Sequence, residues 1–328
     1  MNIVLLSGGS GKRLWPLSND IRSKQFLKIF KREDGSYESM LQRVYRQIKT
    51  ADPDGAVTIA AGSSQVSAIR DQLGEDIRIS AEPCRRDTFP AIALAAAYLH
   101  DVQGVDEDEG VIVCPVDPYV NGDYFEAIKR LWELAKAGAA DLVLMGIDPT
   151  YPSEKYGYII AADNAEVSKV LTFKEKPDAA TARQYIEQGG LWNGGVFACK
   201  LSYVLRYAHR LLGFTDHADL TAKYEALPKI SFDYAVVEHG SDIAVMRFGG
   251  AWKDLGTWNT LTEAMEEAAV GDVRFNEACR NVHAINELGI PILAMGLKDV
   301  VIAASPSGIL IADKEQSSYI KPFVEKID

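Results

Sequence analysis

The sequence predicts a doubly wound α/β fold, in which a mainly parallel sheet is covered by helices on both faces. Short, continuous apolar runs alternate with amphipathic runs through most of the 328-residue chain. Such apolar runs are typical of strands buried on both faces, and their alternation with helices is typical of a parallel sheet. We therefore expect a Rossmann-like sheet that presents its ligands at the carboxyl ends of the strands.

Each element in the first half of the chain follows from a local pattern. Continuous apolar runs predict strands at 2–6, 56–61, 110–116 and 141–147. Helical periodicity predicts helices at 39–49, 63–73, 90–102 and 124–138. Thr88 and Pro90 precede the alanine-rich run, and this pairing is typical of a helix start.

The middle of the chain has a different pattern, which we interpret as a substrate-sized insertion laid on the same sheet. It contains predicted strands at 156–162, 170–176, 192–200 and 242–248 and predicted helices at 177–189, 203–212 and 232–240. A further helix at 257–270 is expected to close a main domain of residues 1–270.

The last part of the chain predicts a small β-rich C-terminal domain of residues 271–328 that ends in a helix. Short apolar runs at 291–297, 300–304 and 308–312 predict closely spaced strands, and 317–327 predicts the terminal helix. No internal repeat indicates a long solenoid.

Composition limits the classes of partner. A formal charge of −11 disfavours a general binder of nucleic acid or of anionic membranes, since both require a basic surface. The four cysteines stand singly and the five histidines are dispersed, which is typical of a reducing cytosol and disfavours a His/Cys metal site. No apolar run reaches the length of a membrane span, so we expect a cytoplasmic protein. A homodimer is left open.

The glycine-rich stretch SGGSGKRLWPLS (7–18) follows the first predicted strand and predicts a phosphate-binding loop. It is not a Walker A loop, because GK is followed by Arg13, and it is not the dinucleotide fingerprint, because Leu14 replaces the third glycine. Consecutive glycines let successive backbone N–H groups form an anion nest, while Pro16 prevents an ordinary helix directly afterwards. We expect Trp15 to pack rather than to stack on a base.

Charge in this region agrees equally with an anion site and with a solvated basic face. The first 32 residues carry a single acid, Asp20, against seven basic residues. These basic residues are Lys12, Arg13, Arg22, Lys24, Lys28, Lys31 and Arg32.

Five motifs in order make the interpretation specific. They are the glycine loop with KQFL (24–27), EPCRRDTFPAI (82–92), FKEKP (173–177), LWNGGVF (191–197) and WKDLGTW (252–258). Together they resemble the sugar-1-phosphate nucleotidyltransferases, and within them the mannose-1-phosphate guanylyltransferase group, over essentially residues 1–270. The resemblance implies that a sugar 1-phosphate attacks the α-phosphorus of an NTP and that pyrophosphate leaves. GTP and α-D-mannose 1-phosphate are the favoured substrates, and GDP-mannose is the expected product.

The resemblance also implies roles for individual residues. The predicted catalytic residues are Arg13, Lys24, Asp117 and Asp254, of which the two aspartates would hold Mg²⁺, a hard cation that prefers carboxylate and phosphate oxygens. The predicted nucleotide-binding residues are Leu6, Ser7, Gly8, Gly9, Ser10, Gly11, Lys12, Arg13, Glu82, Arg86 and Asp87. The predicted sugar-phosphate-binding residues are Tyr156, Gly157, Glu175, Lys176, Asn193 and Gly194.

Purely structural interpretations compete with some of these roles. Asp117 could cap the turn that follows it, and Asp254 could cap the next helix. Glu82, Arg86 and Asp87 agree equally well with surface salt bridges.

The sequence departs from the pattern of the resembled family at three positions. Pro118 stands where the metal strand usually has His, Gly194 stands where Ser is usual, and Asp87 stands where Asn is usual. These departures leave the reaction in place but leave open another NTP and another hexose- or heptose-1-phosphate. A catalytically inactive, nucleotide-sugar-sensing relative is a further alternative, although all four predicted catalytic residues are present. Because longer relatives carry a fused isomerase domain for which this chain is too short, we expect one activity.

Overall fold

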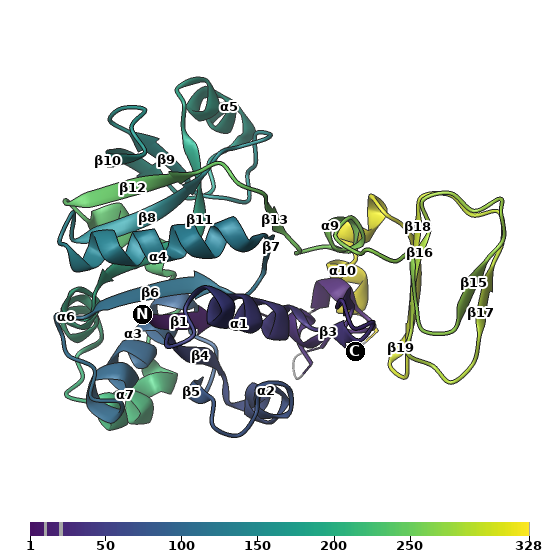
Figure 1. Ribbon diagram of the computed structural model, residues 1–328, viewed down its shortest axis with the longest axis horizontal. Helices are drawn as coiled ribbons and strands as arrows, with labels where there is room; N and C mark the ends of the chain where they lie inside the picture. The colour runs from purple at the N-terminus through teal and green to yellow at the C-terminus, as the bar shows by residue number, and fades with distance from the viewer. Residues whose placement is uncertain (10–11, 20–21, 328) are drawn as a thin grey trace.

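The computed structural model describes residues 1–9, 12–19 and 22–327, and its centre is a nine-stranded sheet (Figure 1). The strand order across this sheet is β5-β4-β1-β6-β11-β8-β12-β10-β9. The bounds are β1 Asn2–Leu6, β4 Ala56–Gly62, β5 Arg78–Glu82, β6 Gly110–Pro115, β8 Leu142–Ile147, β9 Tyr158–Ala161, β10 Val167–Lys174, β11 Leu191–Lys200 and β12 Ile243–Phe248.

The doubly wound α/β fold predicted from the sequence is confirmed, with a sheet of mixed direction. β5, β4, β1 and β6 run parallel, as do β8 and β12. β11 pairs antiparallel with β6 and β8, and β10 pairs antiparallel with β12 and β9. The antiparallel strands come from the middle segment, which joins the main sheet as expected: β11 lies between β6 and β8, and β12, β10 and β9 continue the sheet beyond β8.

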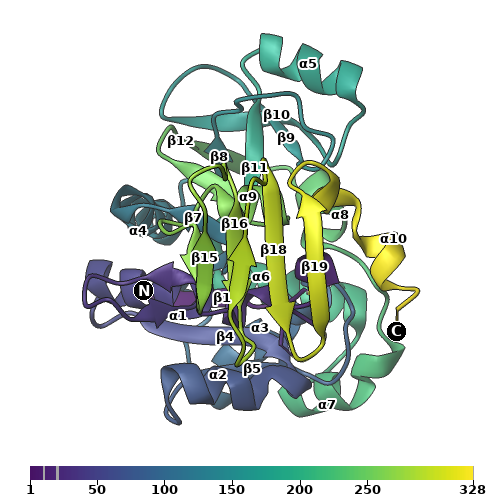
Figure 2. The ribbon, with the colours of Figure 1, turned by 90° about the vertical axis from the view of Figure 1, so that its right-hand side faces the viewer.

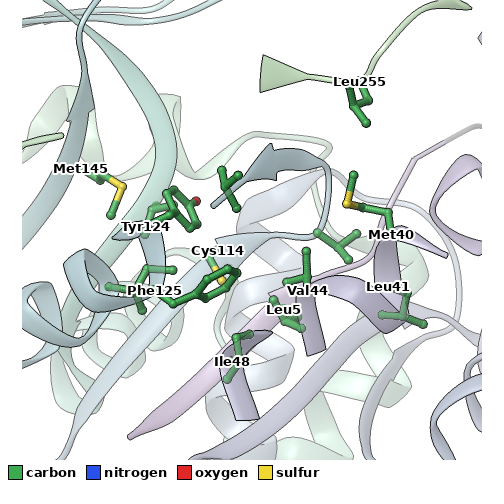
Figure 3. Close-up of a cluster of buried hydrophobic side chains, with 14 of the residues drawn as sticks. Leu5, Met40, Leu41, Val44, Ile48, Cys114, Tyr124, Phe125, Met145 and Leu255 are labelled. Carbon is green, nitrogen blue, oxygen red and sulfur yellow. The ribbon is translucent and has the colours of Figure 1, made fainter. Parts of the chain in front are cut away.

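Helices cover both faces of this sheet. Their bounds are α1 Met40–Ala51, α2 Val66–Leu73, α3 Thr88–Ala97, α4 Gly122–Lys136, α5 Ala179–Glu187, α6 Leu201–Leu212, α7 His217–Lys223, α8 Phe232–Ala235, α9 Trp258–Thr262 and α10 Lys321–Val324. Ile3 and Leu5 of β1 share one buried cluster with α1 and α4 (Figure 3). Val4, on the opposite face of β1, shares another cluster with α3 and α6. Both faces of β1 are therefore buried, which explains its continuous apolar sequence.

Local sequence sets several helix starts. The Ser39 hydroxyl accepts a hydrogen bond from the Gln42 N–H, and the Gln42 side chain in turn accepts one from the Ser39 N–H, so a capping box begins α1. Asp87 caps α3 with a φ of +69°, and the helix begins at Thr88, two residues before the predicted start at residue 90. The last turns of the 90–102 prediction form a π-helix at Tyr98–Val102.

Two short ribbons lie outside the main sheet. β2 (Phe30–Lys31) pairs with β3 (Tyr37–Glu38), and β7 (Pro118–Val120) pairs antiparallel with β13 (Trp252–Asp254). The second ribbon brings the segment after β6 against a segment far along the chain, and it places Asp254 opposite Pro118.

The C-terminal appendage consists of short strands that wind into stacked turns. Its strands are β14 Ala269–Val270, β15 Val273–Phe275, β16 His283–Asn286, β17 Ile292–Ala294, β18 Val300–Ser305 and β19 Gly308–Asp313. β14, β16 and β18 run parallel in one sheet, β19 adds antiparallel to β18, and β15 and β17 form a second parallel pair. Successive turns of chain thus stack on one another, with a small apolar interior that contains Val282, Ala284 and Ile302.

The four-stranded sheet of the appendage packs against the rest of the molecule. Ile285, Val301 and Ala303 belong to the same buried cluster as β1 and α1. Figure 1 shows α9 and α10 between the main sheet and β16 and β18, and Figure 2 shows this appendage sheet face on. The division into domains at residue 270 remains a prediction.

Three helix predictions are wrong in extent. The helix expected at 257–270 ends at Thr262, and β14 occupies 269–270. Glu263, Glu266 and Glu267 would lie toward the negative end of a longer helix, and Glu267 instead pairs with Lys31. The helix expected at 317–327 is a 3₁₀ turn at Gln316–Tyr319 followed by α10, because Pro322 cannot donate the hydrogen bond that a continuous helix requires.

The helix expected at 232–240 is likewise divided, into α8 and a 3₁₀ turn at Val237–His239. Among the described residues, no helix is long and apolar enough to span a membrane.

Candidate active site

Asp117 and Asp254, the two predicted metal ligands, lie together with Lys24. Asp117 follows the end of β6, and the β7–β13 ribbon carries Asp254 to the same place. Lys24 Nζ lies 3.1 Å from Asp117 Oδ2 and 3.8 Å from Asp254 Oδ1. Three of the four predicted catalytic side chains therefore meet, although they come from distant parts of the chain.

The charges at this point are closely coupled. Burial raises the pKa of Asp254, the Asp117 carboxylate raises it further, and Lys24 and Arg13 lower it. Arg13, the fourth predicted catalytic residue, is exposed and close enough to act on this carboxyl electrostatically. The site therefore combines two acids with two cations in a partly buried environment.

Neither aspartate serves as a cap. The Thr257 and Thr260 side chains cap α9, so Asp254 is not needed there. Asp117 Oδ1 is buried and has no hydrogen-bond partner within the described part of the chain. A buried carboxylate oxygen without a donor is costly unless a cation or donor joins it, so this atom fits a ligand for a hard cation such as Mg²⁺. No group of three or more acidic, histidine or cysteine side chains gathers as a metal site in residues 1–9, 12–19 and 22–327.

The described part of the glycine loop is held by side chains that the sequence did not single out. Gln25 Nε2 donates to the Ser7 carbonyl oxygen at 2.7 Å, and Ser23 Oγ donates to the Gly9 carbonyl oxygen at 3.2 Å. Gly9 has a φ of +134°, which disfavours any side chain, and no heavy atom lies within 4 Å of the Cβ position of Gly8 or Gly9. Ser10, Gly11 and the side chain of Lys12 lie outside what the structure describes.

A pocket of about 340 Å³ extends from this loop along the carboxyl ends of the first strands. Its lining includes five predicted nucleotide-binding residues and the predicted metal ligand Asp117. These residues are Leu6, Gly8, Gly9, Glu82 and Asp87. Its size falls within the range of small-molecule sites, and its position agrees with the rule for ligands in open α/β sheets.

Among the described residues, Glu82, Arg86 and Asp87 form no ion pair, and each makes a different contact. Glu82 is buried and accepts a hydrogen bond from the Tyr224 hydroxyl at 2.8 Å, and burial raises its pKa. The Asp87 carboxylate accepts from the Thr88 N–H at 2.7 Å as it caps α3.

Arg86 does not line the pocket described above. Its guanidinium donates to the carbonyl oxygens of Tyr224 and Glu225, while the neighbouring Arg85 does line the pocket and donates to the Gly9 carbonyl oxygen at 3.0 Å. The resemblance of RDT (86–88) to the motif of the family led to Arg86, and no sequence pattern singled out Arg85.

The predicted sugar-phosphate residues form a second cluster. Glu175 is buried beside Lys176, and an added Cβ at Gly157 would lie 2.6 Å from Glu175 Oε2. The Asn193 N–H donates to the Gly157 carbonyl oxygen at 2.8 Å. At Gly194 an added Cβ would lie 3.0 Å from the Ile147 side chain, so that glycine serves close strand packing.

Asp233 belongs to the same cluster and was missed in the sequence. Asn193 Nδ2 donates to Asp233 Oδ1 at 2.7 Å. Burial raises the pKa of Asp233 to about 6, with a further contribution from the Glu175 carboxylate. Asp233 lies in the short helix α8, where neither motif nor periodicity distinguishes it.

Aromatic rings connect this second cluster to the ribbon that carries Asp254. The Tyr156 ring lies 4.9 Å from the Trp192 ring and 5.5 Å from the Trp252 ring, measured between centroids. Burial raises the pKa of Tyr156, and the Asp254 carboxylate raises it further. The two clusters are therefore adjacent.

The basic residues near the N-terminus divide into two groups. Lys24 and Arg13 act on the aspartate pair, whereas Arg22 pairs with Glu287, Lys31 with Glu267 and Arg32 with Glu38. Part of the basic run is thus paired with acids of the protein, while an anion site at Lys24 and Arg13 stays a prediction. Trp15 packs as expected, with its ring against Gly308.

The family model described as nucleotidyl transferase matches residues 2–270, which include every predicted site residue. The chain belongs to the nucleotidyl transferase family. It is 31% identical to a mannose-1-phosphate guanylyltransferase from Escherichia coli, and the match covers 99% of this chain and 75% of the relative.

Solved structures agree with this family membership. A Thermus thermophilus structure named mannose-1-phosphate geranyltransferase superposes with a TM-score of 0.82 at 28% identity, covering 99% of this chain and 98% of the other. UDP-glucose pyrophosphorylase from Acinetobacter baumanii superposes with a TM-score of 0.57 at 16% identity, over 80% of this chain and 91% of that one. The similarity to UDP-glucose pyrophosphorylase shows only that the two proteins share a fold.

Proposed function

We propose that this nucleotidyltransferase joins GTP and α-D-mannose 1-phosphate to give GDP-mannose and pyrophosphate. The observation that carries the reaction is the meeting of Asp117, Asp254 and Lys24 beside the glycine loop. The choice of substrates rests on relatives such as the Escherichia coli mannose-1-phosphate guanylyltransferase.

The nucleotide is proposed to lie along the pocket of about 340 Å³, with its phosphates at the glycine loop and Asp117 and its base toward Glu82. Backbone N–H groups in the glycine loop bind phosphate oxygens, and Arg13 adds a planar cation toward the leaving pyrophosphate. Arg85 serves this pocket in place of Arg86, because Arg85 lines it and holds Gly9.

The sugar phosphate is proposed to lie against the second cluster. Glu175 and Asn193 offer oxygen and amide groups to sugar hydroxyls, and Lys176 offers a cation to the phosphate. Gly157 keeps space beside Glu175, because any side chain there would contact the carboxylate. Tyr156 forms part of the apolar wall on the side of Asp254.

Asp117 and Asp254 are the residues that would hold Mg²⁺. When bound, this ion neutralises charge on the phosphate oxygens of the nucleotide. The unpartnered Asp117 Oδ1 and the oxygen-only donors of the pair support this assignment.

The chemistry requires no covalent enzyme intermediate. A phosphate oxygen of the sugar 1-phosphate forms a bond to the α-phosphorus, and the bond between that phosphorus and the bridging oxygen breaks, so the electron pair leaves with pyrophosphate. The protein holds the two reactants in line and stabilises the charge on the transferring group. Lys24 lies at the carboxylates and Arg13 near them, so both cations can act on this charge.

A substrate panel tests the proposal. The protein is incubated with Mg²⁺ and each of four NTPs, crossed with the 1-phosphates of mannose, glucose, galactose and a heptose, and pyrophosphate and the nucleotide sugar are quantified. We expect GTP with mannose 1-phosphate to give the highest kcat/KM. Faster turnover of another pair would refute the assigned substrates but keep the reaction, and binding of GDP-mannose without turnover of any pair would identify a sensing relative.

The proposed setting is the cytoplasm, with small-molecule partners rather than nucleic acid or membrane, in agreement with the net charge of −11 and four free cysteines. A homodimer is proposed through β19, which lies at the edge of its sheet and exposes Ile309 and Ile311. Light scattering of the wild type and of Ile311→Asp tests this assembly. We expect the wild type to have the mass of a dimer and the variant to have the mass of a monomer.

A further inference from the structure

The C-terminal appendage contacts the chain segment that carries two of the predicted catalytic cations. We call residues 12–19 and 22–26 the basic segment, because Arg13 and Lys24 lie near its two ends. Between these two cations the appendage contacts the segment at Trp15, Pro16 and Arg22. These contacts join a region outside the matched family model, which ends at residue 270, to the proposed phosphate site.

The first two contacts are close and partly buried. An added Cβ at Gly308 would lie 2.6 Å from Trp15 Cζ2, so the Trp15 ring lies directly on the turn between β18 and β19. Ser305 Oγ at the end of β18 donates to the Pro16 carbonyl oxygen at 2.8 Å, and this bond is buried. Trp15 also contacts α9, because its carbonyl oxygen accepts a hydrogen bond from Trp258 Nε1 at 3.2 Å.

The third contact is a paired ion bridge. Arg22 Nη1 and Nη2 donate to Glu287 Oε2 and Oε1 at 2.6 and 2.7 Å. A bidentate pair of this kind fixes the orientation of both side chains. Because the side chains are 42% and 28% exposed, the pair contributes little to the stability of the fold.

Within the part of the chain that the structure describes, the side chains of the two cations make few other contacts. Lys24 Nζ reaches the Leu255 carbonyl oxygen at 3.4 Å in addition to the two aspartates. Arg13 is exposed and lies two residues before Trp15. Trp15 is two residues from Arg13, and Arg22 is two residues from Lys24, so a displacement of either would act on the backbone that carries a cation, although Ser23 and Gln25 also anchor the backbone beside Lys24 through the glycine loop.

We propose that the appendage is a positioning element of the phosphate site, in which Glu287, Ser305 and Gly308 hold the basic segment so that Arg13 and Lys24 meet the triphosphate. This inference rests on the proposed function, since it assigns the phosphate site to the reaction. It gives the appendage a part in substrate binding that does not require it to touch either substrate.

Charge reversal at the Arg22–Glu287 pair provides the test. The variants are Arg22→Glu, Glu287→Arg and the double exchange, and the readouts are kcat and KM for the NTP and the affinity for Mg²⁺ with inorganic tripolyphosphate. Positioning predicts that Glu287→Arg raises KM and weakens tripolyphosphate binding about tenfold, roughly 1.4 kcal/mol. The double exchange should recover to within about threefold of wild type, roughly 0.65 kcal/mol.

Glu287→Arg separates positioning from simple electrostatics, because it adds positive charge near an anion site. Electrostatics alone would strengthen tripolyphosphate binding, so stronger binding in this variant would overturn the proposal. Failure of the double exchange to recover would overturn it too. Ser305→Ala provides a second route, since it removes the buried bond to Pro16 without changing charge, and it should raise KM with a smaller change in kcat.

A matched control is Arg130→Glu, which breaks the exposed Arg130–Glu166 pair between α4 and the start of β10. It should leave KM and tripolyphosphate affinity unchanged, and thermal melts should place all variants close to wild type. Equal effects from Arg130→Glu and Glu287→Arg would contradict the proposal. An absence of wild-type turnover in the substrate panel would instead refute the proposed function, while tripolyphosphate binding would still report on positioning.

Discussion

Replacement of Asp254 by Asn should abolish turnover while slightly stabilising the free protein. The substitution preserves the shape of the side chain but removes the charge that lies 3.8 Å from Lys24 and beside Asp117. The charged form of Asp254 is disfavoured by burial, so this carboxylate should lower the stability of the folded protein in the absence of substrate. The two effects therefore have opposite signs, which a merely damaging substitution would not produce.

The magnitudes follow from the surroundings of the carboxylate. Removal of one group that stabilises transition-state charge costs about 10²–10³ in kcat. Because no third protein ligand gathers with Asp117 and Asp254 in the described residues, we expect the upper end, about 10³-fold or about 4 kcal/mol. The Asp254 side chain is 34% exposed, so solvent screening limits the stability gain to about 0.5 kcal/mol.

The pH dependence has a definite sign. The folded pKa of Asp254 is raised, so the folded state binds more protons than the unfolded state in the range between the unfolded and folded pKa values. Wild-type stability should therefore fall as pH rises through that range, and the destabilisation by the ionised Asp254 carboxylate persists at neutral pH. In Asp254→Asn this contribution to the decline is absent.

Initial rates of pyrophosphate release and urea melts at about pH 4.5 and about pH 7 measure both effects, since these values lie near and well above the unfolded pKa of an aspartate. Asp76→Asn, in the exposed turn between α2 and β5, is the matched control and should behave as wild type. Retention of more than about a tenth of wild-type kcat by Asp254→Asn would refute the metal assignment. A lower stability than wild type at neutral pH would refute the electrostatic argument.

Three further substitutions test the neighbouring groups. Lys24→Met should lower kcat about 10²–10³-fold and should raise the pKa of Asp254, since Lys24 lowers that pKa. Initial rates measure the first effect and the pH dependence of unfolding measures the second. An unchanged rate would contradict the role of the cation. The folded pKa of Asp233 is raised to about 6, so the stability of the wild type should fall as pH rises from about 4 to about 6, and Asp233→Asn should remove this fall. Urea melts across this range measure the stability, and an identical dependence of stability on pH in both proteins would contradict the burial argument. Tyr224→Phe removes the 2.8 Å hydrogen bond to buried Glu82 and should cost about 1–2 kcal/mol of stability; a loss below about 0.3 kcal/mol in the same melts would show that the bond is not significant.

Much of the fold follows from local patterns. The strand at 2–6 has the predicted bounds, because the side chains of Ile3, Val4 and Leu5 alternate between two helix layers and must be apolar. Helix α3 begins at Thr88, within two residues of the start predicted from Thr88 and Pro90, since capping is decided by adjacent residues, here Asp87. Lys24 and Asp254 lie in the ordered motifs and Asp117 directly follows the strand predicted at 110–116, so the sequence drew attention to all three residues.

The remaining features depend on distant partners. The strands β7 and β13 have three residues each, and their pairing depends on segments that are remote in sequence. Asp233 becomes distinctive only through its contact with Asn193. The helix predicted at 257–270 failed because tertiary contacts of Glu267 and the pairing of β14 outweigh local helix propensity.

The most direct test of the central claim is a crystal structure with GDP-mannose and Mn²⁺, in which anomalous scattering locates the metal. The account predicts one metal peak bound by an oxygen of Asp117 and an oxygen of Asp254, at about 2.0–2.2 Å from each, together with a phosphate oxygen. The base should lie in the pocket lined by Glu82, and the sugar should lie beside Glu175. A metal that touches neither aspartate, or phosphates bound away from Lys24, would contradict the account.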